Sequence, residues 1–200
     1  MPLAACMDGL RAMLPPEAGV GGADTAEAYP IMPGETLAGA HPARQRETAA
    51  GRHAARMALG RPVAVGRETD HAPIWPEGWI GSITHSGPVA LAAVLPQGPW
   101  LAIGIDIEDR TPLVPAVARL VAGGCDSGVA KTIFVAKEAA YKAQFMISRQ
   151  RMGFDGFDVR ITPAGFEAQF TQATGPFAAG TSLRGRLWFG TTYLVATVVV

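Results

Sequence analysis

The chain has 200 residues, which is enough for one ample hydrophobic core or two small domains. Its seventeen basic and seventeen acidic residues cancel to a formal net charge of +0, so nothing in this balance calls for nucleic acid or an anionic membrane as a partner. No apolar stretch is long enough to cross a bilayer, and the sequence does not begin like a secretory signal. Cys6 and Cys125 lie far apart and outside any metal-binding spacing, so we expect a cytoplasmic protein without disulfides.

The first 43 residues are rich in Ala, Gly and Pro. The prolines and the run Gly19 to Gly22 predict interruptions of any long element, because both residue types favour turns. We therefore expect this segment to be an arm that packs on the rest of the protein. Glu35 is interpreted as a first-turn helix residue and nothing more.

A helix is predicted over residues 44–59, with a proline near its start and Gly60 after its end. Arg44, Arg52 and Arg56 fall along one broad face of this helix. Guanidinium groups in such a row can bind phosphate through paired hydrogen bonds, although an ordinary solvated basic face explains the pattern equally well.

The stretch from 61 to 79 is predicted to be a loop that Trp75 and Trp79 anchor. A strand is expected at 89–95, and His85 precedes it between two hydroxyl residues. This histidine could donate to a phosphate, act as a base or satisfy a turn, and a single histidine is more often structural.

Residues 101–108 are predicted to form a strand that ends in two acidic residues. Because side chains alternate along a strand, Asp106 and Glu108 should share one face while the isoleucines share the other. Two carboxylates about 7 Å apart along a strand can bind one Mg²⁺, although a solvated acidic edge is the other explanation. Gly104 allows a close approach of another backbone or a ligand.

A second helix is predicted over residues 131–145, after a short helical run near 117–121. Glu138 and Lys142 are four residues apart on one face of this helix, a spacing that also suits a simple surface ion pair. The last third is rich in predicted strands, which cover residues 157–162, 166–171, 185–189 and 193–200. This order of elements predicts an α+β fold with helices packed on antiparallel sheets.

Three sequence blocks occur in an order that is typical of one family. Residues 51–59 read G-R-H-A-A-R-M-A-L, residues 75–86 contain W-P-x-G and G-S-I-T-H-S, and residues 104–108 with 134–142 read G-I-D-I-E and F-V-A-K-E-A-A-Y-K. Together they resemble the Sfp-type 4′-phosphopantetheinyl transferases, closest to the enterobactin synthetase component D branch. The resemblance covers about residues 40 to 200. It implies a pseudo-twofold, monomeric α+β unit with similar halves at about 1–108 and 109–200 and a site at their junction.

The resemblance also implies an activity. Such proteins use Mg²⁺, or Mn²⁺, to move the phosphopantetheine arm of coenzyme A onto a serine of an acyl, aryl or peptidyl carrier protein, as in siderophore, nonribosomal peptide or polyketide synthesis. They release 3′,5′-ADP. The implied metal ligands are Asp106, Glu108 and Glu138. The implied catalytic residues are Glu138, as the base or as the positioner of a metal-bound water, and Lys142 and Asp106, which lie beside it at the reacting diphosphate. The implied coenzyme A ligands are Arg44, Arg52, Thr84, His85 and Lys142.

Two departures from the family pattern keep other functions open. Residues 109–130 are short and Gly/Ala-rich, in the region where a carrier protein is expected to dock. Ahead of Pro73, where relatives often carry a basic residue, the sequence reads Asp70-His71-Ala72, so one nucleotide contact is either missing or supplied by Arg67. One alternative is a degenerate module that binds coenzyme A or a carrier protein without transfer. Another is a Mg²⁺-dependent hydrolase of coenzyme A or related diphosphates.

Overall fold

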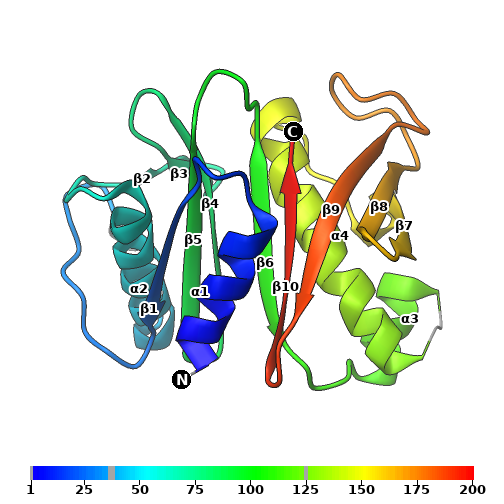
Figure 1. Ribbon diagram of the computed structural model, residues 1–200, viewed down its shortest axis with the longest axis horizontal. Helices are drawn as coiled ribbons and strands as arrows, with labels where there is room; N and C mark the ends of the chain where they lie inside the picture. The colour runs from blue at the N-terminus through cyan, green and yellow to red at the C-terminus, as the bar shows by residue number, and fades with distance from the viewer. Residues whose placement is uncertain (1, 36–38, 124–125) are drawn as a thin grey trace.

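The computed structural model describes residues 2–35, 39–123 and 126–200 (Figure 1). Its α-helices in these ranges are α1 (Pro2–Met13), α2 (Pro42–Leu59), α3 (Pro115–Ala122) and α4 (Ser127–Ser148), and a 3₁₀ turn, η1, covers Phe154–Gly156. The strands are β1 (Gly19–Asp24), β2 (Gly66–Arg67), β3 (Pro73–Ile74), β4 (Trp79–Ser86), β5 (Val89–Pro96), β6 (Ile103–Asp109), β7 (Phe157–Thr162), β8 (Gly165–Phe170), β9 (Ser182–Phe189) and β10 (Tyr193–Val199). No described helix has both the length and the apolar character needed to cross a membrane.

The strands form two main sheets, ordered β1-β5-β4 and β6-β10-β9-β8-β7, and a small β2-β3 pair. All pairings within these sheets are antiparallel, so the predicted α+β architecture is confirmed. Strand β6 is hydrogen-bonded to β10 and so belongs to the five-stranded sheet. The pseudo-twofold relation between halves that divide near residue 108 stays a prediction.

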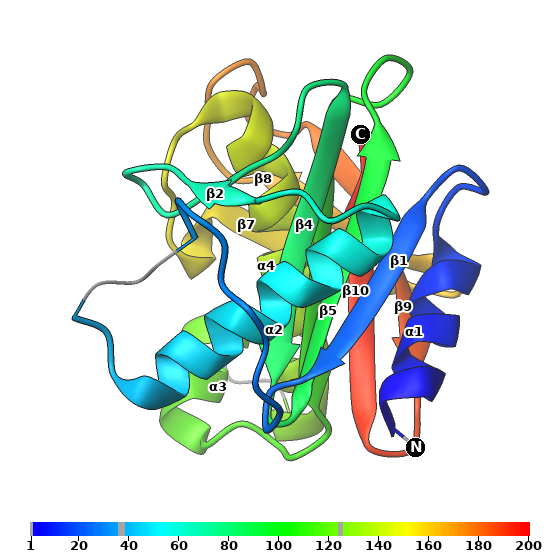
Figure 2. The same cartoon turned by 90° about the vertical axis from the view of Figure 1, so that its left-hand side faces the viewer.

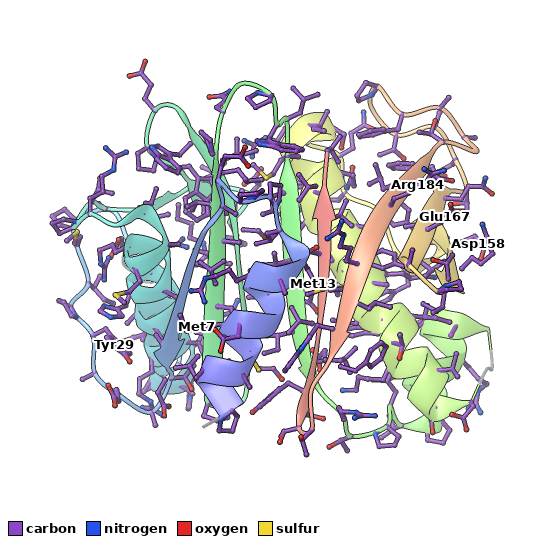
Figure 3. All side chains as sticks on the ribbon, viewed as in Figure 1. Met7, Met13, Tyr29, Asp158, Glu167 and Arg184 are labelled. Atoms are coloured by element: carbon purple, nitrogen blue, oxygen red, sulfur yellow. The ribbon has the colours of Figure 1, made fainter. Side chains whose placement is uncertain are left out.

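Helices cover both faces of this double sheet. Helix α1 lies across the front of Figure 1, where Figure 3 labels its Met7 and Met13, and its buried side chains join one core with alternate residues of β5, β6 and β10. On the opposite face, α2 packs on β1 and β5, as Figure 2 shows, and α4 packs on β6 and β10. One core under α1 therefore spans both sheets. On the opposite face, the junction between the two sheets lies between α2 and α4.

The two sheets meet where β4 runs beside β6, and side chains rather than a backbone ladder join these strands. The hydroxyl groups of Ser82, Thr84 and Ser86 accept hydrogen bonds from the backbone N–H groups of residues 105, 107 and 109, at 3.1, 3.3 and 3.3 Å. Three successive inward-facing hydroxyls thus satisfy the edge of β6. This seam fixes the register between β4 and the strand that carries the two carboxylates.

The N-terminal segment packs on the rest of the protein as expected, but the predicted interruption of its elements is wrong, because the structure shows a twelve-residue helix and a six-residue strand there. The glycines of β1 do not mark turns. A Cβ at Gly21 would lie 2.7 Å from the backbone nitrogen of Ala58, and a Cβ at Gly19 would lie 2.9 Å from the backbone carbonyl carbon of the same residue. Glycine is required here because α2 packs directly on the backbone of the strand.

Glu35 also has a role that its sequence position does not indicate. Its carboxylate is fully buried and accepts from Arg56 Nη1 at 2.7 and 2.9 Å, and from the backbone N–H groups of Met32 and Val65 at 2.9 Å each. Arg56 also donates to the carbonyl of Pro30 at 2.8 Å. Arg56 is therefore a structural partner of the N-terminal segment and does not extend the phosphate-binding row predicted on α2.

Candidate active site

A cleft of about 870 Å³ opens between α2, β4 and the C-terminal half of α4. The side chains that line it include six arginines or lysines and four aspartates or glutamates. The cationic ones are Arg44, Arg52, Arg67, Lys142, Arg149 and Arg151. The cleft therefore has an excess of positive charge although the whole chain is neutral, which favours an anionic ligand.

Asp106 lies at the floor of the cleft, on the face of β6 that points away from the isoleucine core. Its Oδ1 atom accepts from Lys142 Nζ at 2.6 Å and from Thr84 Oγ1 at 2.9 Å, and Lys142 also donates to the carbonyl of Ile105 at 3.0 Å. The Oδ2 atom is buried without a hydrogen-bond partner among the described residues. A buried carboxylate oxygen of this kind is costly unless something binds it, so Asp106 Oδ2 is a candidate cation ligand.

Glu108 lies two residues further along β6 and faces α4 as well. Its Oε2 atom pairs with Lys131 Nζ at 3.0 Å, and Lys131 also lies 3.7 Å from Asp109 Oδ1. Burial raises the pKa of Glu108, while the hydrogen bond from Lys131 opposes this shift. The alternation predicted for this strand is therefore confirmed, with both carboxylates on one face and Ile105 and Ile107 buried on the other.

Glu138 is half-buried on α4 near both strand carboxylates. Burial raises its pKa, and the negative charges of Asp106 and Glu108 raise it further, while Lys142 lowers it. Glu138 lines a second cavity of about 230 Å³ together with Phe154 and Phe157. Tyr141 lines both this cavity and the main cleft, so the face of α4 next to Glu138 connects the two.

The three predicted metal ligands are near one another but are not drawn together. Within the described ranges, no three His, Cys, Asp or Glu side chains lie close enough to hold a metal ion. The donor set nevertheless suits a hard divalent cation, because it offers oxygen ligands whose mutual repulsion a cation would relieve. The unpartnered Oδ2 of Asp106 is the most direct sign of this fit.

Arg44 and His85 lie together at the α2 side of the cleft. Arg44 Nη1 is 2.8 Å from His85 Nε2, and the same guanidinium pairs with Glu47 at 3.1 Å. Because arginine can only donate, His85 Nε2 accepts and the ring is neutral with its proton on Nδ1. Burial lowers the pKa of His85, and the charge of Arg44 lowers it further against the opposing effect of Glu47.

Buried N–H groups without a hydrogen-bond partner in the described structure gather in the same cleft. They are Nε of Arg52, Nε of Arg67 and Nε1 of Trp75. The pKa of Arg52 is lowered to about 10, mainly by burial and also by the charges of Arg67 and Arg56, while Glu35 partly offsets this shift. Crowded cations and unpaired donors are both stabilised by a bound anion, so this part of the cleft is the candidate phosphate site.

The loop between β2 and β3 carries Asp70 across the cleft toward the end of α4. Its carboxylate lies 3.7 Å from Arg149 Nη1, and its carbonyl accepts from Arg151 Nη2 at 3.5 Å. Asp70, which departs from the family pattern, therefore contacts two arginines at and just after the C-terminal end of α4. Positive charge on this side of the cleft comes from Arg67, Arg149 and Arg151.

Comparison with known proteins assigns the chain to a family. The family model of the 4′-phosphopantetheinyl transferase N-terminal domain matches residues 33–95. The chain is 31% identical over 167 residues to 4′-phosphopantetheinyl transferase PptT of Mycobacterium tuberculosis, an alignment that covers 71% of each protein. The chain belongs to the 4′-phosphopantetheinyl transferase family.

Two further members of the family are similar over shorter lengths. 4′-Phosphopantetheinyl transferase Npt of Nocardia iowensis is 35% identical over 114 residues, which cover 50% of this chain and 51% of Npt. 4′-Phosphopantetheinyl transferase Svp of Streptomyces mobaraensis is 31% identical over 150 residues, which cover 65% of this chain and 60% of Svp. The matched part of the chain thus spans about half to three fifths of these two relatives.

Several of the residues predicted from the sequence line this cleft, and some of their contacts differ from those predicted. Arg44, Arg52, His85 and Lys142 line the cleft, as expected of ligands for an anion. Thr84 also lines it, but its hydroxyl bonds Asp106 and the backbone of Ile107 instead of pointing freely at a ligand. Lys131 was not singled out, although its position seven residues before Glu138 puts both on one helical face.

Proposed function

We propose that the protein transfers the 4′-phosphopantetheine moiety of coenzyme A to the acceptor serine of an acyl, aryl or peptidyl carrier protein, releasing 3′,5′-ADP. Membership of the family supports this assignment, and the three ordered sequence blocks support the enterobactin synthetase component D-like branch. The observation that carries it is the Asp106–Lys142 pair at the floor of a basic cleft, with Glu138 beside it.

The nucleotide end of coenzyme A would occupy the α2 side of the cleft. Arg44 and His85 already share a hydrogen bond there, and a phosphate would compete with Glu47 for the Arg44 guanidinium. The buried Nε atoms of Arg52 and Arg67 offer further donors. Paired arginine donors match the geometry of phosphate oxygens, which is why this end is assigned to the phosphates.

The reacting diphosphate would lie over Lys142 and Asp106. Lys142 Nζ uses two of its donors for Ile105 and Asp106, which leaves the third for a diphosphate oxygen. The serine Oγ attacks the phosphorus next to the pantetheine arm, the bond to the 3′,5′-ADP oxygen breaks, and the serine proton passes to Glu138. A carboxylate with a raised pKa is a better proton acceptor at neutral pH than an ordinary one.

Asp106, Glu108 and Glu138 would hold Mg²⁺, with Mn²⁺ as a substitute. When bound, the cation supplies positive charge to the diphosphate oxygens as negative charge develops on them. The orphaned Asp106 Oδ2, and the negative charges of Asp106 and Glu108 that raise the pKa of Glu138, support this ligand set. Thr84 and Lys142 keep Oδ1 of Asp106 occupied, so its Oδ2 is the oxygen available to the cation.

The test is intact-protein mass spectrometry of a panel of apo carrier proteins after incubation with the protein, coenzyme A and Mg²⁺. A phosphopantetheine mass should appear on the carrier and should be lost with EDTA, with a serine-to-alanine carrier and with Glu138→Gln. Glu167→Gln is the matched control, because it removes a carboxylate on β8 that pairs with Arg184 (both labelled in Figure 3) and that lines neither the main cleft nor the second cavity.

The other functions have distinct outcomes in the same assay. Coenzyme A binding with no mass on any carrier would identify a binding module and overturn the proposal. Release of 3′,5′-ADP at the same rate with and without a carrier would identify a hydrolase, with water in place of the serine.

A further inference from the structure

All three lysines of the chain are on α4: Lys131, Lys137 and Lys142. The remaining basic residues are arginines, and many of them are exposed. Lys131 and Lys137 are buried and Lys142 is partly buried, and each ammonium has a defined partner. Lysine is thus used in this protein where a compact single-point donor is needed inside the structure.

Lys131, Glu138 and Lys142 form one stripe along α4, because spacings of seven and eleven residues bring helical side chains back to nearly the same face. This stripe faces β6. Lys142 pairs with Asp106 at 2.6 Å and Lys131 pairs with Glu108 at 3.0 Å, so each strand carboxylate has its own lysine. Lys137 lies off the stripe and donates to the carbonyls of Val121 and Phe154 at 2.8 and 2.6 Å.

We propose that Lys131 is a positioning residue for the cation site of the proposed transferase, an inference that rests on the proposed function. Its ammonium holds Oε2 of Glu108, and no described residue bonds Oε1, which stays available to a divalent cation. The arrangement matches that of Asp106, where Lys142 and Thr84 take Oδ1 and leave Oδ2 unpartnered. Outer partners of this kind orient metal-binding carboxylates.

The identity of the side chain matters for this role. An arginine fork donates to both oxygens of a carboxylate, whereas a lysine ammonium can hold one and leave the other. Glu108 is the nearest acidic partner of Lys131, because the lysine side chain is only 9% exposed and its second acidic neighbour, Asp109, is 3.7 Å away. Replacement of Lys131 by arginine therefore keeps the charge but blocks the oxygen that the cation needs.

The experiment compares Mg²⁺ binding by isothermal titration calorimetry in the full chain, its Lys131→Met and Lys131→Arg variants, and a Lys137→Met control, each saturated with coenzyme A. Lys131→Met and Lys131→Arg should each weaken Mg²⁺ binding by about 10-fold or more. Lys137→Met removes another buried ammonium from α4, so it should lower stability while leaving Mg²⁺ affinity within about twofold. Coenzyme A affinity without Mg²⁺ reports whether each variant is folded.

Lys131→Gln, which keeps a single-point donor without the charge, should retain Mg²⁺ affinity better than Lys131→Met, and it replaces Lys131→Met if that variant does not fold. Two results would overturn the inference. The first is unchanged or tighter Mg²⁺ binding both in Lys131→Arg and in Lys131→Met, or in Lys131→Gln where that variant replaces Lys131→Met. The second is a wild-type chain that binds no Mg²⁺. If the wild type binds Mg²⁺ but modifies no carrier, the proposed function fails, and the calorimetric comparison still decides the role of Lys131.

Discussion

Gly104→Ala tests whether the contact between β6 and α4 positions the candidate active site. A Cβ at Gly104 would lie 2.6 Å from the backbone nitrogen of Ala143 and closer still to the carbonyl oxygen of Ala139, whereas ordinary contact begins at 3.4 Å. Both neighbours are helix backbone and have no rotamer to adopt. Helix and strand must therefore separate by about 0.8 Å or more.

Two effects follow from this separation. Overpacking of this kind costs about 1–3 kcal/mol of stability. Because β6 carries Asp106 and α4 carries Glu138 and Lys142, the same shift moves the proposed catalytic groups apart, and a misplacement of about 1 Å can cost about 10²-fold in rate. The measurements are urea unfolding and the rate of carrier modification per folded molecule.

Gly185→Ala is the matched control within the same sheet. Its Cβ would lie 2.6 Å from the carbonyl oxygen of Thr197 and would also meet the ring of Phe166, so its three nearest atoms belong to β10 and β8 and not to α4. It should lose stability through overpacking and keep the transfer rate. Wild-type stability and rate in Gly104→Ala would refute the reasoning, and equal rate losses in both variants would show that the effect is not specific to the β6–α4 contact.

Three further outcomes follow from the structure. Thr84→Val removes the hydroxyl that bonds Asp106 and leaves the Ile107 N–H unpaired, so it should lower the free energy of unfolding in urea by about 1–3 kcal/mol. It should also lower kcat more than coenzyme A affinity, and Thr84→Ser should restore both. Glu35→Gln leaves the buried Arg56 without its counter-charge and should cost about 3–5 kcal/mol, read as a fall in Tm; an unchanged Tm would contradict the assigned pair. Because the folded-state pKa of Glu138 is raised above its ordinary value of 4.5, its contribution to stability is fully present below that pH and is lost as pH rises through the folded pKa. Glu138→Gln should therefore unfold at higher urea concentration than the wild type at pH 8 but not at pH 4, and wild-type transfer should fall as pH drops through the raised pKa.

The sequence by itself determined the main elements of the cleft. The helices predicted over 44–59 and 131–145 are present as α2 and α4, and the strand predicted over 101–108 is present as β6. Their signals are local, since capping residues, helical periodicity and strand alternation depend on neighbours in the chain. The order of the three sequence blocks then indicated the 4′-phosphopantetheinyl transferase family, which the comparisons confirm, and a branch of it that stays a prediction.

The N-terminal elements were decided by tertiary packing. Gly19 and Gly21 have the local character of turn residues, yet they belong to a strand because α2 lies directly on that strand's backbone. Glu35 and Arg56 are twenty-one residues apart and show no relation in sequence, but burial makes each the necessary counter-charge of the other.

Tertiary packing also determined which charged side chains pair at the site. Glu138 and Lys142 have the spacing of an i to i+4 ion pair, but Lys142 binds Asp106 on β6 instead. The helical spacing of Lys131, Glu138 and Lys142 is present in the sequence, whereas the strand that this stripe faces is not. Which carboxylate each lysine holds depends on how α4 lies on β6, and long-range packing of that kind leaves no local trace in the sequence.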